Sequence, residues 1–117
     1  MMEITYYHNP RCSKSRSGLE LLRDKGAQPT VVEYLVNPPT REQLMDILNK
    51  LGCHPRQLMR QKEPEYKENN LDDPNLSSEA LVAAMIQFPK LIERPIGVTS
   101  AKAAVGRPTE NLLNLLS

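Results

Sequence analysis

The sequence has only two cysteines, Cys12 and Cys53, among its 117 residues. Two thiols are too few for the disulfide framework of a small secreted protein, and their spacing is not that of a zinc site. We therefore expect two reduced cysteines in a cytosolic setting, and no metal centre.

The chain also lacks an excess of basic residues and a long apolar run. Its formal charge is +1 with 25% charged residues, so it has no surplus of the kind that binds nucleic acid through the phosphates. The first residues do not form a basic segment followed by an apolar one, and no uncharged run approaches the ~18 apolar residues of a membrane span. The sequence therefore predicts a cytoplasmic protein that binds neither nucleic acid nor membrane.

The length favours one domain over residues 1–117. Residues 3–7 predict a strand, residues 13–25 a helix that stops at Gly26, and residues 30–34 a second strand. This order favours a parallel βαβ unit, a unit that places its chemistry on the loop after the first strand. Cys12 lies on that loop.

The middle of the chain, about residues 40–90, predicts a helical insert. Thr40 and Gln43 have the spacing of a capping box, and Gly52 follows the apolar stripe that they open. Residues 61–75 are polar and predict short helical turns and exposed loop. The other helix starts in the insert are expected at Pro55 and Ser77.

After the insert, residues 94–98 and 103–106 form two short apolar runs that predict a β-hairpin. Pro108 suits the first turn of a closing helix. The leucines expected to bury against the sheet from this helix are Leu112, Leu113, Leu115 and Leu116. The whole order predicts an α/β fold of thioredoxin-like arrangement: a mixed sheet with the helical insert between an N-terminal βαβ half and a C-terminal ββα half.

Cys12 is expected to be a reactive thiol. A helix N-terminus offers unpaired N–H groups and a positive dipole end, and Arg11, Lys14 and Arg16 add positive charge nearby. A cysteine whose pKa falls from ~8.5 to ~6.5 goes from ~3% to ~75% thiolate at pH 7. A free cysteine is often a small buried core residue instead, but the polar neighbours on both sides favour the reactive thiol.

Three further residues allow two interpretations each. His8 either donates to the thiolate from the same loop or is a solvated histidine at a strand end. Ser15 either hydrogen-bonds to the sulfur or reflects the usual polarity of a helix start. Cys53 lies outside any Cys-x-x-Cys motif, so a partly buried thiol is favoured over a resolving cysteine.

Three arginines stand in unusual surroundings. Arg60 follows two apolar residues, Arg94 precedes a proline at a strand start, and Arg107 lies between a glycine and a proline. Because Arg94 and Arg107 flank the same hairpin, we expect them to meet at one end of the sheet. A single arginine is usually solvated or paired with a carboxylate, whereas several fixed guanidinium groups suit a tetrahedral oxyanion.

Together these segments resemble the glutaredoxin-coupled arsenate reductase (ArsC) family nearly from end to end. The motifs that carry the resemblance are His8-Asn9-Pro10-Arg11-Cys12-Ser13-Lys14-Ser15-Arg16, Asn37-Pro38-Pro39-Thr40-Arg41, Leu58-Met59-Arg60, Glu93-Arg94-Pro95-Ile96 and Gly106-Arg107-Pro108. Within this family, the Cys-Ser-Lys-Ser loop resembles a housekeeping branch more than the members dedicated to arsenic resistance.

The resemblance implies a cytosolic enzyme that reduces arsenate to arsenite through a covalent adduct of Cys12 with arsenic. Glutathione would be a co-substrate and glutaredoxin a partner, with no bound cofactor. His8 and Ser15 match residues that tune the nucleophile. The matches to oxyanion-binding residues are Arg60, Arg94 and Arg107, and the match to the cis-proline of thioredoxin-like folds is Pro95.

Two other functions stay open at this point. The same fold and thiol can serve another oxyanion or a glutathione-mixed disulfide. The Spx-like regulators share the fold, bind RNA polymerase and use a Cys-x-x-Cys pair as a redox switch. Ser15 stands where their second cysteine would be, and the arginine set favours anion chemistry.

Overall fold

The computed structural model describes residues 3–116. In chain order, its elements are β1 (Thr5–His8), α1 (Ser13–Asp24), β2 (Thr30–Glu33), α2 (Arg41–Leu51), the 3₁₀ helix η1 (Pro55–Leu58), α3 (Pro64–Glu68), α4 (Ser78–Gln87), η2 (Pro89–Leu91), β3 (Ile96–Val98), β4 (Ala103–Val105) and η3 (Thr109–Leu116). They form two compact units. The first contains the described residues up to Asn37 and those from Arg94 onward, and the second is Pro38–Glu93.

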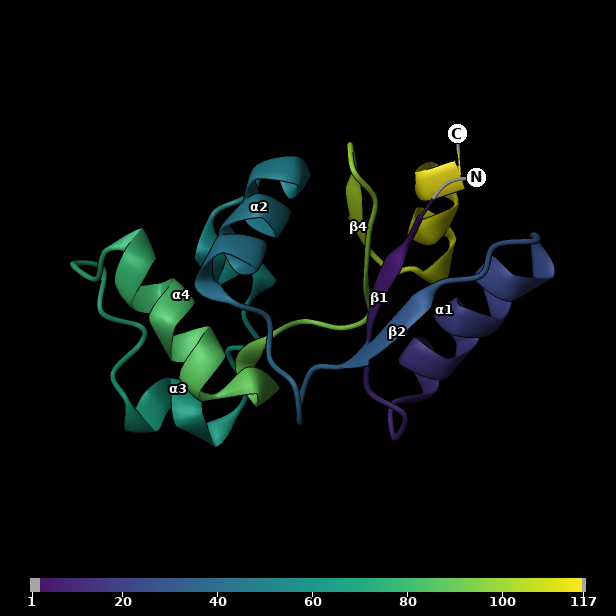
Figure 1. The fold of residues 1–117 in the computed structure, drawn as a ribbon. Coiled ribbons are helices and arrows are strands. Elements are labelled where there is room, and N and C mark those ends of the chain that lie inside the picture. The colour runs from purple at the N-terminus through teal and green to yellow at the C-terminus, as the bar shows by residue number, and fades with distance from the viewer. Residues whose placement is uncertain (1–2, 117) are drawn as a thin grey trace. The chain divides into compact units, whose positions relative to one another are not determined.

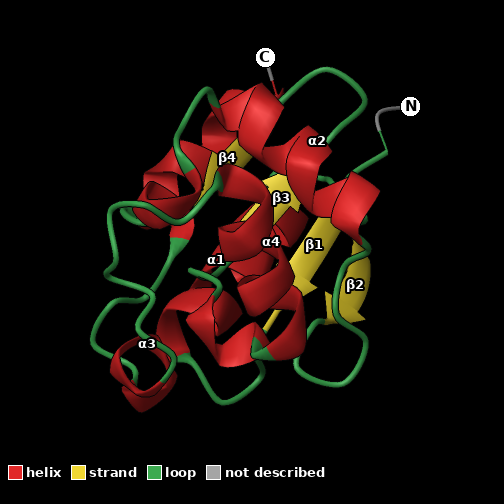
Figure 2. Ribbon diagram, turned by 90° about the vertical axis from the view of Figure 1, so that its left-hand side faces the viewer, coloured by secondary structure: helices red, strands yellow, loops and turns green. Residues whose placement is uncertain are grey.

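The first unit is built on a four-stranded mixed sheet with the strand order β2-β1-β3-β4, which can be followed across Figure 2. β1 pairs with β2 in parallel, with Thr5 opposite Thr30, and with β3 in antiparallel fashion, with Thr5 opposite Val98. β3 and β4 form an antiparallel hairpin. The predicted βαβ unit and hairpin are thus joined in one sheet, as a thioredoxin-like fold requires.

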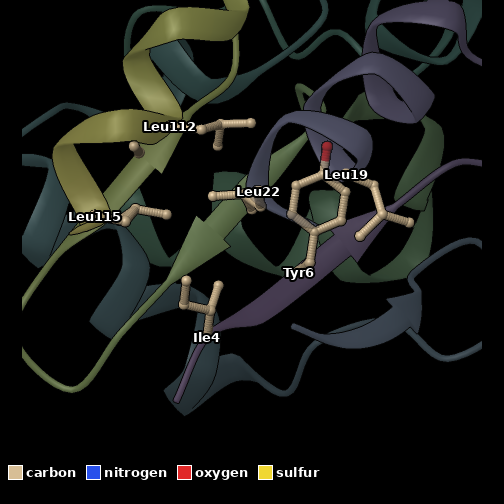
Figure 3. Packing of buried hydrophobic residues seen from close by; sticks show 7 residues of the cluster. Ile4, Tyr6, Leu19, Leu22, Leu112 and Leu115 are labelled. Atoms are coloured by element: carbon tan, nitrogen blue, oxygen red, sulfur yellow. The ribbon is translucent and has the colours of Figure 1, made fainter. Parts of the chain in front are cut away.

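One face of this sheet is covered by α1 and η3, which lie on the same side of the strands in Figure 1. Alternate side chains along an extended chain point to the same side, so Tyr6 of β1 and Ile4, directly before β1, both turn to that face. They pack against Leu19 and Leu22 of α1, as Figure 3 shows. Ala104 of β4 and two leucines of η3 complete the cluster. This core holds α1 against β1 and so positions the loop between them.

The closing segment differs from the expected helix. It is a 3₁₀ helix, and of its leucines only Leu112 and Leu115 are fully buried, whereas Leu113 and Leu116 are partly exposed. In a 3₁₀ helix the side chains at i and i+3 eclipse one another, so a pair three residues apart faces the sheet and its neighbours do not.

The second unit contains the helices of the predicted insert. The Thr40 hydroxyl accepts from the Gln43 N–H at 3.1 Å and the Gln43 side chain accepts from the Thr40 N–H at 2.9 Å, so the predicted capping box is present at the start of α2. Gly52 ends this helix with a φ of 65°, the left-handed conformation that favours glycine. Ser77 caps α4, which packs against α2.

The polar segment of residues 61–75 contains a short helix, α3, and is exposed over most of its length. Tyr66 and Leu71 are exceptions, because both side chains are buried within the second unit. Among the described residues, no helix is long and apolar enough to cross a membrane. The assignment of residues 1–117 to a single domain stays a prediction.

Candidate active site

Cys12 occupies the N-cap position of α1, with φ −95° and ψ 123°. A tight turn brings it there: the Cys12 N–H donates to the Asn9 carbonyl at 3.0 Å, and the Arg11 N–H donates to the Asn9 side-chain oxygen at 3.0 Å. The cysteine is 8% exposed, so it is more enclosed than its polar neighbours suggested. It nevertheless lies on the loop after β1, where the sequence places it.

The Ser15 side chain does not bind the sulfur. Its hydroxyl oxygen accepts from the Asn9 N–H at 2.9 Å and lies 2.7 Å from Nδ1 of His8. Ser15 is fully buried, so its hydroxyl proton needs an acceptor, and Nδ1 of His8 supplies one. This places the proton of a neutral His8 ring on Nε2.

The neutral state of His8 agrees with its surroundings. Burial lowers the pKa of His8, and the carboxylate of Glu33, which raises the pKa, is opposed by the charges of Arg23 and Arg16. His8 is thus a buried partner of Ser15 and not a solvated strand-end residue. Its action on the thiolate stays a prediction.

The pKa of Cys12 lies below that of an ordinary cysteine, although burial of the thiol acts to raise it. Four groups outweigh burial: the backbone N–H of Ser15, the charge of Arg94, the backbone N–H of Lys14 and the charge of Arg107. The two amides lie close enough to stabilise the thiolate, although the side chain forms no regular N-cap hydrogen bond. A thiolate at this position is therefore favoured by both the helix start and distant arginines.

Arg94 and Arg107 meet at the base of the β3–β4 hairpin, as expected. Nε of Arg107 donates to the Arg94 carbonyl at 2.7 Å, and Nη2 of Arg107 lies 3.5 Å from Sγ of Cys12. Two nitrogens of the Arg94 guanidinium, Nε and Nη1, are buried. The peptide bonds from Arg94 to Pro95 and from Arg107 to Pro108 are both cis. The structure thus brings two cationic side chains from the end of the chain to a thiol near its beginning.

The described geometry can be compared with known proteins. A model of the ArsC family matches residues 7–115. The chain belongs to the ArsC family.

Three proteins similar to this chain match it over nearly their whole length. The Escherichia coli (strain K12) protein YfgD is 52% identical over 115 residues, which are 97% of each chain. A protein of Neisseria meningitidis serogroup A named arsenate reductase is also 52% identical, over 96% of this chain and 97% of its own. A solved structure described as an arsenate reductase from Vibrio cholerae has a TM-score of 0.94 and 49% identity, and covers 97% of this chain and 98% of its own.

Arg60, the third arginine suggested by the ArsC resemblance, belongs to the second unit. Its N–H donates to the Leu91 carbonyl at 2.7 Å, and its Nη1 forms an ion pair with Glu63 at 2.5 Å. Both side chains are largely enclosed, with 29% and 21% of their surface exposed. Glu63 was not among the predicted site residues, and its signal in the sequence is its i+3 spacing from Arg60. Oxyanion binding by Arg60 stays a prediction.

Cys53 also lies in the second unit, directly after the glycine that ends α2. It is partly buried, and burial raises the pKa of its thiol. Both cysteines are free thiols. Within residues 3–116, no group of three or more His, Cys, Asp or Glu side chains is arranged to hold a metal ion.

Proposed function

We propose that this protein reduces arsenate to arsenite, with Cys12 as the nucleophile. The observation that carries the proposal is the sulfur itself, a thiol of lowered pKa with the Arg107 guanidinium 3.5 Å away and the charge of Arg94 beside it. Membership of the ArsC family and similarity to the Neisseria and Vibrio proteins named arsenate reductase support arsenate as the substrate.

The electrostatics of the site suit an anionic substrate. A thiolate and an arsenate anion repel one another, and the fixed charges of Arg94 and Arg107 offset that repulsion as the two approach. Sγ of Cys12 then forms a bond to arsenic, and one arsenic–oxygen bond breaks. The departing oxygen takes up protons and leaves as water, so the thiolate ends as a covalent adduct with pentavalent arsenic.

Glutathione is the proposed source of electrons. Position 15, three residues after Cys12, is a serine whose side chain is bound to His8, so it offers no second thiol for a Cys-x-x-Cys pair. A glutathione thiol attacks the adduct instead. Over the whole reaction the thiols of Cys12 and glutathione become one mixed disulfide. Arsenic takes the two electrons and falls from oxidation state +5 to +3, and one of its oxygens leaves as water. Glutaredoxin reduces the disulfide that contains glutathione.

Arg60, in the second unit, is proposed to bind an oxyanion, as its match in the ArsC family implies. Its partner in the structure is Glu63, a carboxylate that offers the guanidinium the same kind of oxygen acceptors as arsenate. Arsenate must therefore compete with Glu63 for Arg60. The ion pair with Glu63 therefore weakens the binding of an anion by Arg60.

The test is turnover by the purified protein with glutathione and glutaredoxin, followed as NADPH oxidation through glutathione reductase. Consumption of NADPH that depends on arsenate is the expected result. Parallel assays replace arsenate by another tetrahedral oxyanion or by a glutathione-mixed disulfide. Turnover with one of these and none with arsenate would contradict the proposed substrate but keep the thiol chemistry.

A further inference from the structure

Tyr6 is a buried tyrosine whose hydroxyl reaches the helix that carries the thiol. It lies in β1 on the same face as His8, and none of its surface is exposed. Its hydroxyl donates to the Ser15 carbonyl oxygen at 2.7 Å, and Figure 3 shows the hydroxyl pointing from the strand toward α1. β1 therefore holds Ser15 twice, by its side chain through His8 and by its carbonyl through Tyr6.

The Tyr6 hydroxyl acts as a constant donor. Burial raises the pKa of Tyr6 far above the range of any physiological pH, and this outweighs the groups that lower it. Because the phenol stays protonated, the hydrogen bond to Ser15 does not change as the thiol titrates.

The peptide group that Tyr6 binds is itself hydrogen-bonded to Cys12. The Ser15 carbonyl and the Arg16 N–H belong to one peptide group, and this N–H donates to the Cys12 carbonyl at 3.0 Å. Successive hydrogen bonds through a peptide group polarise and strengthen one another. The Ser15 N–H, on the other side of the same residue, is one of the groups that stabilise the sulfur anion.

Gly18 makes room for this hydroxyl. A Cβ at position 18 would lie 2.3 Å from the hydroxyl oxygen of Tyr6, closer than real contacts allow. Gly18 is an interior residue of α1, where glycine weakens a helix compared with alanine. The glycine lowers helix stability, and the space it leaves is filled by the Tyr6 hydroxyl together with Cδ1 of Leu112.

We propose that Tyr6 is a positioning residue for the nucleophile: its hydroxyl fixes the first turn of α1 through Ser15, and thereby holds the backbone amides of that turn at Sγ of Cys12. Gly18 contributes by leaving the space in α1 that the Tyr6 hydroxyl occupies. The proposal rests on the nucleophilic role of Cys12 in the proposed function. Its test measures the reactivity of the Cys12 thiol and does not require turnover. The positioning role of Tyr6 can therefore be tested even if the wild-type protein does not reduce arsenate.

The experiment is the pH dependence of Cys12 alkylation by iodoacetamide in protein that carries Cys53→Ser, so that a single thiol reacts. Tyr6→Phe keeps the ring and removes only the hydroxyl. We expect the midpoint to move to higher pH and the rate below the midpoint to fall by up to about fivefold, the equivalent of one neutral hydrogen bond. At pH values above both midpoints the two rates should converge, because both proteins are then fully thiolate.

Tyr66→Phe is the matched control, since it removes the hydroxyl of another buried tyrosine, in the second unit. It should leave the midpoint unchanged. Gly18→Ala offers a second variant, because its methyl group would lie 2.3 Å from the Tyr6 hydroxyl oxygen and 2.6 Å from Cδ1 of Leu112, so both side chains must shift. Displacement of the Tyr6 hydroxyl should move the midpoint in the same direction as Tyr6→Phe. A Tyr6→Phe protein with a lower melting temperature and an unaltered midpoint would overturn the proposal, because Tyr6 would then serve the core alone. A folded Gly18→Ala protein with an unaltered midpoint would overturn it as well.

Discussion

Replacing Arg107 by alanine should reduce the thiolate population of Cys12 by about sevenfold at pH values below its midpoint. Nη2 of Arg107 lies 3.5 Å from the sulfur, and the arginine is exposed to solvent. At this separation two unit charges interact by about 1.2 kcal/mol in a medium as polar as water, which is the appropriate limit for an exposed group. An energy of that size changes a protonation equilibrium by about sevenfold.

The assay is the rate of iodoacetamide alkylation against pH in the Cys53→Ser background. Arg11→Ala is the matched control, because it removes the same charge from the residue next to the cysteine in sequence. The arginines that lower the pKa of Cys12 most are Arg94 and Arg107, so removal of Arg11, which is exposed, should have the smaller effect. Arg107→Lys, which keeps the charge but loses the planar fork, should lie between the wild type and Arg107→Ala.

An Arg107→Ala midpoint equal to that of the wild type would refute this reasoning. So would a larger effect from Arg11→Ala, because the charge that stabilises the thiolate would then come from the loop and not from the hairpin. Circular dichroism of each variant shows whether the comparison is made on folded protein.

Three other predictions concern the ion pair, a helix cap and pH. Glu63→Gln should lower the KM for arsenate by up to about fivefold, the energy of one partly exposed ion pair, whereas an unchanged or higher KM would show that Glu63 only holds Arg60 in place. Thr40→Ala should cost about 1 kcal/mol of unfolding free energy in a denaturant titration, because it opens the capping box of α2; a loss near zero would contradict this. Because the pKa of Cys12 is lower in the folded protein, the unfolded chain binds more protons between the two values, so the free energy of unfolding rises with pH up to about 8.5. This gain is lost as pH falls through the folded pKa, and a stability difference between wild type and Cys12→Ser that does not vary with pH would be inconsistent with it.

Local sequence signals predicted most of the fold. The capping pattern at Thr40, the glycine at position 52 and the two short apolar runs of the hairpin each report on a few neighbouring residues, and each predicted feature is present in the structure. The helix type of the closing segment could not be predicted, because leucines at successive positions suit an α-helix and a 3₁₀ helix equally well. Tyr66 was missed for a similar reason: its burial depends on packing within the second unit and not on the polar residues around it.

The candidate site was also predicted only in part from the sequence. The helix start at Cys12 and the position of two arginines at one end of a hairpin follow from the sequence order. The source of the positive charge did not follow from the sequence: the pKa of Cys12 is lowered by Arg94 and Arg107, and the guanidinium of Arg16 donates to the Pro10 carbonyl. Tyr6 was assigned only to a strand, although a glycine inside the next helix was a signal that something occupies the space beside it.

The most direct test of the account is arsenate-dependent turnover of the single-cysteine variants. We predict that Cys53→Ser reduces arsenate with glutathione and glutaredoxin at about the rate of the wild type. Cys12→Ser, tested on protein that circular dichroism shows to be folded, should have no arsenate-dependent turnover. Turnover that survives in Cys12→Ser, or that disappears in Cys53→Ser, would contradict the claim that the thiol at the start of α1 carries the reaction alone.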